Sequence, residues 1–141
     1  MKNKFSIAMS LAVVLAMLLT SFALADNLNN DATTSSGLTT ITAGGSTTIT
    51  YQLVSNNAPS GDFSGCDATT SKPVNVTITK PAAVSGPSSF SFTGCGNPNK
   101  VQITFSSNTA GSYNITHSIS GGVSGSLFNN NADFTLTVNS V

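Results

Sequence analysis

The side chains that could perform acid–base or nucleophilic chemistry are few in this 141-residue chain. His117 is the only histidine, the acidic residues are five scattered aspartates, and glutamate and arginine are absent. No serine stands in a G-x-S-x-G turn, which positions the nucleophile of α/β-hydrolases, and no paired carboxylates suit a glycosidase. The sequence therefore predicts no catalytic residue, no cofactor-binding residue and no metal ligand, and we expect the protein not to be an enzyme.

Two weaker kinds of chemistry stay open as alternatives. His117 falls on the inward phase of an alternating run with Ile115 and Ile119, which favours a structural histidine over a metal ligand or a catalytic base. Loop oxygens of Asp62 and Asp67 are candidates for calcium, but their spacing does not match an EF-hand loop.

The composition excludes several classes of protein. Only 7% of the residues are charged, against roughly 25% in an average soluble protein, and the formal net charge is zero. No basic stripe is present to bind phosphate backbones, so we expect no nucleic-acid partner. Serine and threonine together number 41, whereas the Glu, Lys, Arg and Leu that coiled coils and helical bundles need are scarce.

Residues 1–25 have the pattern of a cleaved signal peptide. Lys2 and Lys4 precede an almost uninterrupted apolar run over 5–22, and Ala23-Leu24-Ala25 supplies the small residues at a cleavage site. A membrane anchor is the competing interpretation, but a span needs about 20 apolar residues and a flanking stop signal. We therefore expect a secreted, extracellular protein that begins at Asp26 and has no membrane span after cleavage.

Cys66 and Cys95, the two cysteines, are expected to form one disulfide. An even number of cysteines in an exported chain is typical of structural disulfides. A metal or redox site is the alternative, but it would need a C-x-x-C pair or histidine partners, and neither is present.

Apolar residues alternate with Thr, Ser and Asn through most of the chain after residue 38, and Gly- or Pro-containing breaks separate the runs. Such alternation is the signature of half-buried strands. It predicts an all-β, two-layer antiparallel sandwich of about seven strands over 38–141, with a closed barrel as the alternative. Residues 26–37 are expected to form a polar N-terminal arm. The predicted core consists of Ile49, Tyr51, Leu53, Val74, Val76, Ile78, Phe90, Phe92, Val101, Ile103, Phe105, Ile115, Phe134, Leu136 and Val138.

The order of these strands, the Gly111-Ser112-Tyr113 segment at the start of the sixth strand and the overall size resemble immunoglobulin-like or fibronectin-like modules of archaeal and bacterial surface proteins. The resemblance covers roughly 38–141 and implies a packing role for Tyr113. The chain departs from antibody domains because it has no tryptophan and because its cysteines are too close for the usual bridge between the sheets. We therefore expect the bridge to join two loops, or a loop to a strand end, outside the main core.

Two kinds of surface feature complete the sequence-based expectations. Asn75-Val76-Thr77 and Asn114-Ile115-Thr116 are N-glycosylation sequons whose polar residues lie on the water-facing phase, so Asn75 and Asn114 are candidate glycosylation sites. Leu127 and Phe128 form an apolar pair before the last strand. The pair is a candidate contact patch if it is exposed; the alternative is that both side chains pack over the end of the sandwich.

These observations favour a non-catalytic cell-surface protein with a structural or adhesive role. One form is a subunit of an extracellular fibre or pilus that adds its arm as a strand to a neighbour's open sheet edge. The alternative is a soluble extracellular binding module for a protein or glycan ligand. The expected partners are further copies of the chain, other cell-surface proteins or glycans. An arm docked on its own sandwich would favour the binding module, and a projecting arm would favour assembly.

Overall fold

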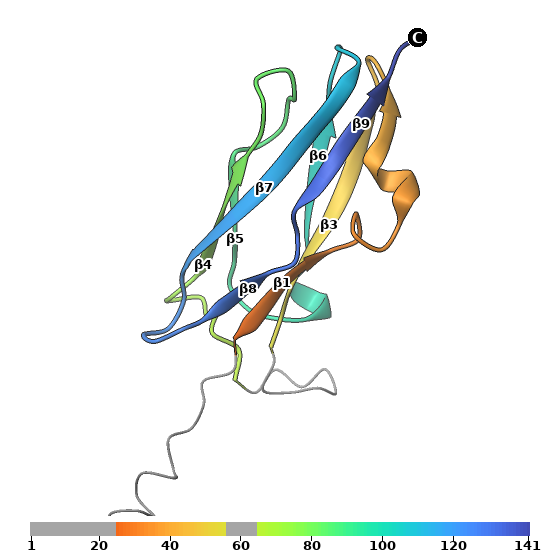
Figure 1. Cartoon of the computed structure of the whole chain (residues 1–141). Helices are drawn as coiled ribbons and strands as arrows, with labels where there is room; N and C mark the ends of the chain where they lie inside the picture. Colours follow the sequence, from red (N-terminus) through yellow and green to blue (C-terminus); the bar gives the residue numbers. More distant parts are fainter. Residues whose placement is uncertain (1–24, 56–64) are drawn as a thin grey trace, which may run out of the picture.

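The computed structural model describes residues 25–55 and 65–141, so the expected signal peptide lies outside the described residues up to position 24. Within the described residues, nine strands form two sheets (Figure 1). The helices of the described residues are two short 3-10 turns, and neither is long and apolar enough to cross a membrane. The elements are β1 (Asp26–Asn30), η1 (Ser36–Thr39), β2 (Thr40–Thr42), β3 (Ser46–Val54), β4 (Val74–Thr79), β5 (Ser89–Phe92), η2 (Asn97–Asn99), β6 (Val101–Ser106), β7 (Gly111–Gly121), β8 (Phe128–Asn130) and β9 (Phe134–Asn139).

The predicted β-rich, two-sheet architecture is confirmed, but the pairing is not wholly antiparallel. The four-stranded sheet has the order β6-β3-β1-β8 and the five-stranded sheet the order β2-β9-β7-β4-β5. The β1–β8 and β2–β9 pairs are parallel. The first two strands, β1 and β2, lie in different sheets, and so do the last two, β8 and β9. Each sheet therefore contains one strand from either end of the described chain, and these two strands pair in parallel. This division also accounts for strands beyond the seven that the sequence predicted.

One apolar core lies between the sheets, and the predicted alternation places most of its members correctly. Three predicted members, Phe90, Val101 and Phe134, are only partly buried and pack against the core from its rim. Seven further apolar residues are buried. Leu28 and Ile41 lie in the short, polar strands β1 and β2, each of which has a single large apolar side chain. The other five lie in connections, where no periodic pattern could predict them: Ala32, Ala68, Val84, Cys95 and Ala132.

The expectation that 26–37 forms a free arm is wrong for β1. Residues 26–30 lie inside the four-stranded sheet, antiparallel to β3 and parallel to β8. The side chain of Leu28 is fully buried, and Asp26 and Asn30 are buried on the same side of the strand. The polar composition of this segment concealed the strand, because a single leucine provides all of its apolar anchoring.

The disulfide between Cys66 and Cys95 is present and joins two connections, as the sequence predicted. Cys66 lies between β3 and β4, and Cys95 lies between β5 and η2. The expected location outside the core is wrong for Cys95, which is only 2% exposed and belongs to the buried cluster. The bridge therefore closes one end of the core.

Reduction of this disulfide is expected to lower the free energy of unfolding by about 3–4 kcal/mol, because the bridge restricts the unfolded chain over a loop of roughly 30 residues. The two cysteines are separated by 29 positions. Denaturant unfolding with and without reductant measures the change, and the double variant Cys66→Ser/Cys95→Ser should match the reduced protein. An unfolding midpoint that does not respond to reductant would contradict the expectation.

Candidate functional site

The polar cluster that most resembles a chemical site is formed by Tyr51, His117 and Asp133. Tyr51 comes from β3 of the four-stranded sheet and His117 from β7 of the five-stranded sheet. The Tyr51 hydroxyl lies 2.9 Å from His117 Nε2, and His117 Nδ1 lies 3.0 Å from Asp133 Oδ1. The cluster is therefore a hydrogen-bonded chain that runs from one sheet through the core to the other.

Asp133 is held in place by donors from two directions. Its Oδ1 accepts the backbone N–H of His117 at 2.8 Å and an N–H of the Asn130 side chain at 2.8 Å. The Asn130 amide also donates to the His117 carbonyl oxygen at 2.9 Å. A carboxylate can only accept, so His117 Nδ1 carries the proton and Nε2 accepts from Tyr51. These contacts fix the tautomer and the orientation of the imidazole.

Burial sets the protonation states of this cluster. It lowers the pKa of His117 below its ordinary value, an effect that the adjacent carboxylate of Asp133 opposes but does not overcome. Burial also raises the pKa of the Tyr51 hydroxyl, and the negative charges of Asp31 and Asp133 raise it further. Hydrogen bonds from Asn130 and His117 hold the pKa of Asp133 low despite some desolvation. At neutral pH the cluster contains a neutral histidine, a protonated tyrosine and a carboxylate.

In this cluster the hydroxyl is buried and the carboxylate is exposed, which is the reverse of a catalytic triad. In a triad the hydroxyl nucleophile faces the substrate and the acid is buried behind the histidine. Here the Tyr51 hydroxyl belongs to a fully buried residue, whereas the Asp133 side chain is 49% exposed. The geometry fits a polar connection that joins the two sheets, and it agrees with the structural role that the sequence favoured for His117.

The lowered pKa of His117 predicts that stability decreases on mild acidification. Because the unfolded chain protonates near the ordinary value of 6.5 and the folded chain only at lower pH, the stabilisation is complete above that value and is lost as the pH falls below it. We expect the free energy of unfolding to decrease from about pH 7.5 to about pH 5.

A matched variant isolates the histidine. His117→Gln should be less stable than the wild type at about pH 7.5, with little change in stability down to about pH 5, because Asp133 titrates at lower pH. Denaturant unfolding at a series of pH values measures both proteins. Parallel pH profiles would show that His117 is not the responsible group.

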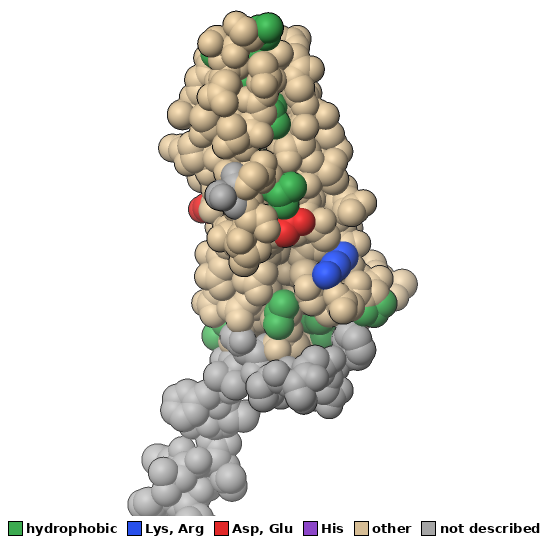
Figure 2. All heavy atoms as spheres, turned by 90° about the vertical axis from the view of Figure 1, so that its right-hand side faces the viewer, with side chains coloured by type: hydrophobic (Ala, Val, Ile, Leu, Met, Phe, Trp, Pro, Cys, Tyr) green, Lys and Arg blue, Asp and Glu red, His purple; other side chains and the backbone are tan. Residues whose placement is uncertain are grey.

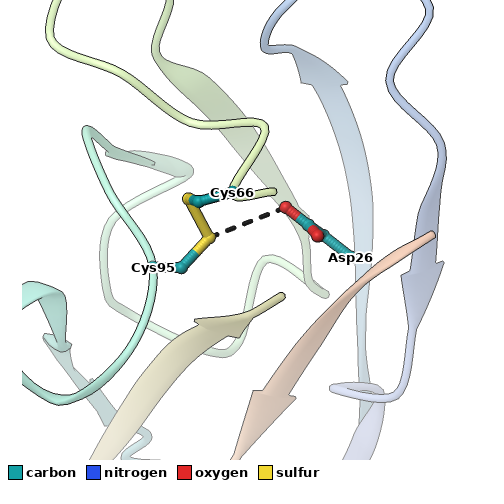
Figure 3. Close-up of side chains that lie close together, drawn as sticks. All are labelled: Asp26, Cys66 and Cys95. Carbon is teal, nitrogen blue, oxygen red and sulfur yellow. Dashed lines mark hydrogen bonds between the residues drawn. A yellow bond between two sulfur atoms is a disulfide. The ribbon is translucent and has the colours of Figure 1, made fainter. Parts of the chain in front are cut away.

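A second cluster brings Asp26 next to the disulfide (Figure 3). The Asp26 Oδ2 accepts the backbone N–H of Asp67 at 2.9 Å and lies 3.6 Å from Cys95 Sγ. A sulfur in a disulfide carries no hydrogen, so the sulfur contact is a close approach rather than a donated hydrogen bond. The same bonding state removes both sulfurs as thiolate ligands, so these three residues do not have the chemistry of a metal site. The cluster instead fixes the start of β1 against the connection that contains Cys66.

The outward side of the five-stranded sheet has an unusual composition. All its outward positions are Ser, Thr or Asn, and none is charged or apolar. Strand register places them side by side, for example Thr77 opposite Ser118 and Asn114 opposite Thr135. We call this surface the hydroxyl–amide face. It consists of Thr40, Thr42, Asn75, Thr77, Thr79, Ser89, Ser91, Ser112, Asn114, Thr116, Ser118, Ser120, Thr135, Thr137 and Asn139.

Apart from one buried aspartate, charge lies in the connections throughout the described chain. Among the described lysines and aspartates, only Asp26 lies in a strand, and it is buried. Figure 2 shows another side of the molecule, where a few separate acidic, basic and hydrophobic side chains stand among other side chains and backbone atoms. Edge strands commonly carry charges that prevent association with other sheets, and the described strands lack such protection.

The remaining sequence-based candidates fall in different places. Asn75 and Asn114 are both exposed on the hydroxyl–amide face, and their glycosylation stays a prediction. Leu127 and Phe128 do not form a common exposed patch, because Leu127 is 54% exposed whereas Phe128 is partly buried against the core. Asp62, one of the two calcium candidates, lies outside the described residues.

Two polar features of the structure are not predictable from the sequence. The link from His117 to Tyr51 and Asp133 depends on the way the two sheets face each other, and no sequence spacing indicates it. The burial of Asp26 was missed because aspartate is rarely buried. Comparison of the chain with protein-family models, curated proteins and solved structures finds no match.

Proposed function

We propose that this chain is a non-catalytic, exported module of immunoglobulin-like architecture with a structural or adhesive role at the cell surface. The architecture is supported by the two facing sheets and by Tyr113, whose hydroxyl donates to the Thr109 carbonyl oxygen at 3.0 Å. A tyrosine at the start of a late strand that bonds a few residues upstream is typical of such domains. Export is supported by the disulfide, since disulfides persist in oxidising compartments.

The hydroxyl–amide face is the observation that carries the adhesive role. Bringing two surfaces together is costly when charged groups lose their water, and no strand position of this face is charged. The carboxylate of Asp133, which lines a shallow pocket with Asn114, Thr116 and Thr135, is the described charge beside it. Its hydroxyl and carboxamide groups both donate and accept hydrogen bonds, so they can exchange water for the groups of a neutral polymer or a second copy. The two sequons lie on this same face, so glycans attached to Asn75 or Asn114 would cover part of it.

Adding charge to the hydroxyl–amide face tests this role. The variant Thr79→Lys/Ser112→Lys places two lysines on non-opposed positions of β4 and β7 and leaves both sequons intact. We expect it to reduce binding of the purified protein to the surface of the cells that produce it, because each lysine must lose water on contact. Fluorescently labelled protein and a cell-sedimentation assay measure the retained fraction.

The control adds the same charge to the other sheet. Thr48→Lys/Gln102→Lys changes two exposed positions on β3 and β6 and should be retained as well as the wild type. Equal retention of all three proteins would refute a contact role for the hydroxyl–amide face.

A self-contained binding module is the second candidate, and the docked position of β1 favours it. Strand addition between subunits would require β1 to leave its own sheet and enter the same place in a neighbour. Asn29 and Gln52 are opposite each other on the outward side of β1 and β3, so a cysteine at each position can report whose β1 occupies the sheet.

The test mixes Asn29→Cys protein with Gln52→Cys protein under oxidising conditions. If β1 stays in its own chain, the mixture should give no Asn29–Gln52 cross-linked dimer, whereas the double variant should form the bond within one chain. Non-reducing electrophoresis and peptide mass spectrometry distinguish these products. A mixed dimer linked at these two positions would instead demonstrate strand exchange and favour the fibre subunit.

A further inference from the structure

A polar cleft of about 290 Å³ lies at the end of the four-stranded sheet, where β1 leaves β3. It is lined by Asn29, Asp31, Thr34, Thr50, Gln52 and Lys100, with Asn30 beneath them. It involves no residue of the hydroxyl–amide face, so a ligand bound here is independent of the adhesive role proposed above. Its size is near the lower limit of small-molecule sites, which suits a single sugar ring.

Asp31 is fixed in this cleft by the sheet. Its backbone N–H donates to the Thr50 carbonyl oxygen at 3.2 Å, and its Oδ1 accepts the Thr50 N–H at 2.8 Å. The Asp31 carbonyl oxygen also accepts the N–H groups of Thr34 and Ser35 in the following turn. The carboxylate is therefore held in one orientation before any ligand arrives, and its other oxygen is available as an acceptor. Such preorganisation lowers the entropic cost of binding.

The neighbouring side chains add donors and one positive charge. Asn29 uses its carboxamide oxygen to accept from Asn131 at 3.3 Å and keeps its NH₂ group as a donor. Gln52 and Lys100 make no side-chain hydrogen bond with other described residues. A cleft with a carboxylate, two carboxamides and an ammonium group matches a ligand that has several hydroxyls and one carboxylate.

We infer that this cleft binds a hexuronate, the sugar ring with a carboxylate that occurs in acidic polysaccharides. The Asp31 carboxylate accepts ring hydroxyls, Asn29 and Gln52 bond the remaining hydroxyls, and Lys100 pairs with the sugar carboxylate. A phosphorylated ligand fits less well, because its greater negative charge would be repelled by Asp31. A neutral hexose lacks the group that Lys100 would bind.

Titration of the ¹⁵N-labelled protein with sodium glucuronate, followed by NMR, tests the inference through the side-chain amide signals of Asn29 and Gln52. No aromatic ring is among the described residues that line the cleft, so we expect saturable shifts with a dissociation constant of roughly a millimolar, the ordinary range for so small a ligand. Lys100→Gln should weaken binding roughly tenfold through loss of the charge-assisted bond. Glucose lacks the carboxylate, so its affinity for the wild type should be as low as the affinity of glucuronate for Lys100→Gln.

The matched control is Lys72→Gln, which removes an exposed lysine from the connection before β4 and should bind glucuronate like the wild type. Glycine, which carries an ammonium and a carboxylate without hydroxyls, separates a sugar site from an amino-acid site. The inference is overturned if no saturable shift occurs at roughly 20-fold the expected dissociation constant, if Lys100→Gln binds glucuronate unchanged, or if glycine binds as tightly.

Discussion

The hydrogen bond between Tyr51 and His117 sets how the two sheets are placed against each other. Both groups are buried between the sheets, and a buried polar group without a partner costs about 1–3 kcal/mol. The two sheets must therefore face each other with β3 opposite β7 in one register. The Tyr51 ring also packs against Phe90 of β5 with ring centroids 4.7 Å apart, so apolar packing and polar pairing specify the same arrangement. Asp133, in the connection between β8 and β9, completes the chain and fixes the start of the last strand.

The first strand of the described chain is coupled to this frame by polar contacts rather than by a large apolar area. β1 buries one leucine, and the carboxylate of Asp26 ties its first residue to the connection that contains the disulfide. The Asp26 N–H also donates to the carbonyl oxygen of Leu127 at 3.0 Å, which brings β8 to the outer side of β1. The disulfide, the first strand and the start of β8 therefore meet at one end of the molecule. Because β1 is an inner strand, β8 pairs with the sheet only while β1 is in place.

The distribution of charge separates the molecule into strands that are neutral outside and connections that carry the few ions. The hydroxyl–amide face is a consequence of this separation, since outward positions of the five-stranded sheet contain only Ser, Thr and Asn. Asp31 and Lys100 lie in connections at one end of the other sheet, where a polar cleft forms between them. The broad neutral surface and the small charged cleft therefore lie on different parts of the protein and suit different kinds of contact.

The β class, the disulfide partners and most of the core follow from the sequence alone, because the alternation of side chains along a strand is a local property and two cysteines allow only one pairing. The sequence also indicated that His117 points inward. The contacts of His117 with Tyr51 and Asp133 do not follow from the sequence, because the first crosses between the sheets over 66 positions and the second depends on how the connection before β9 packs beside β7. The same holds for β1, whose position between β3 and β8 depends on hydrogen bonds from its backbone, which every residue type offers and no side-chain pattern reveals.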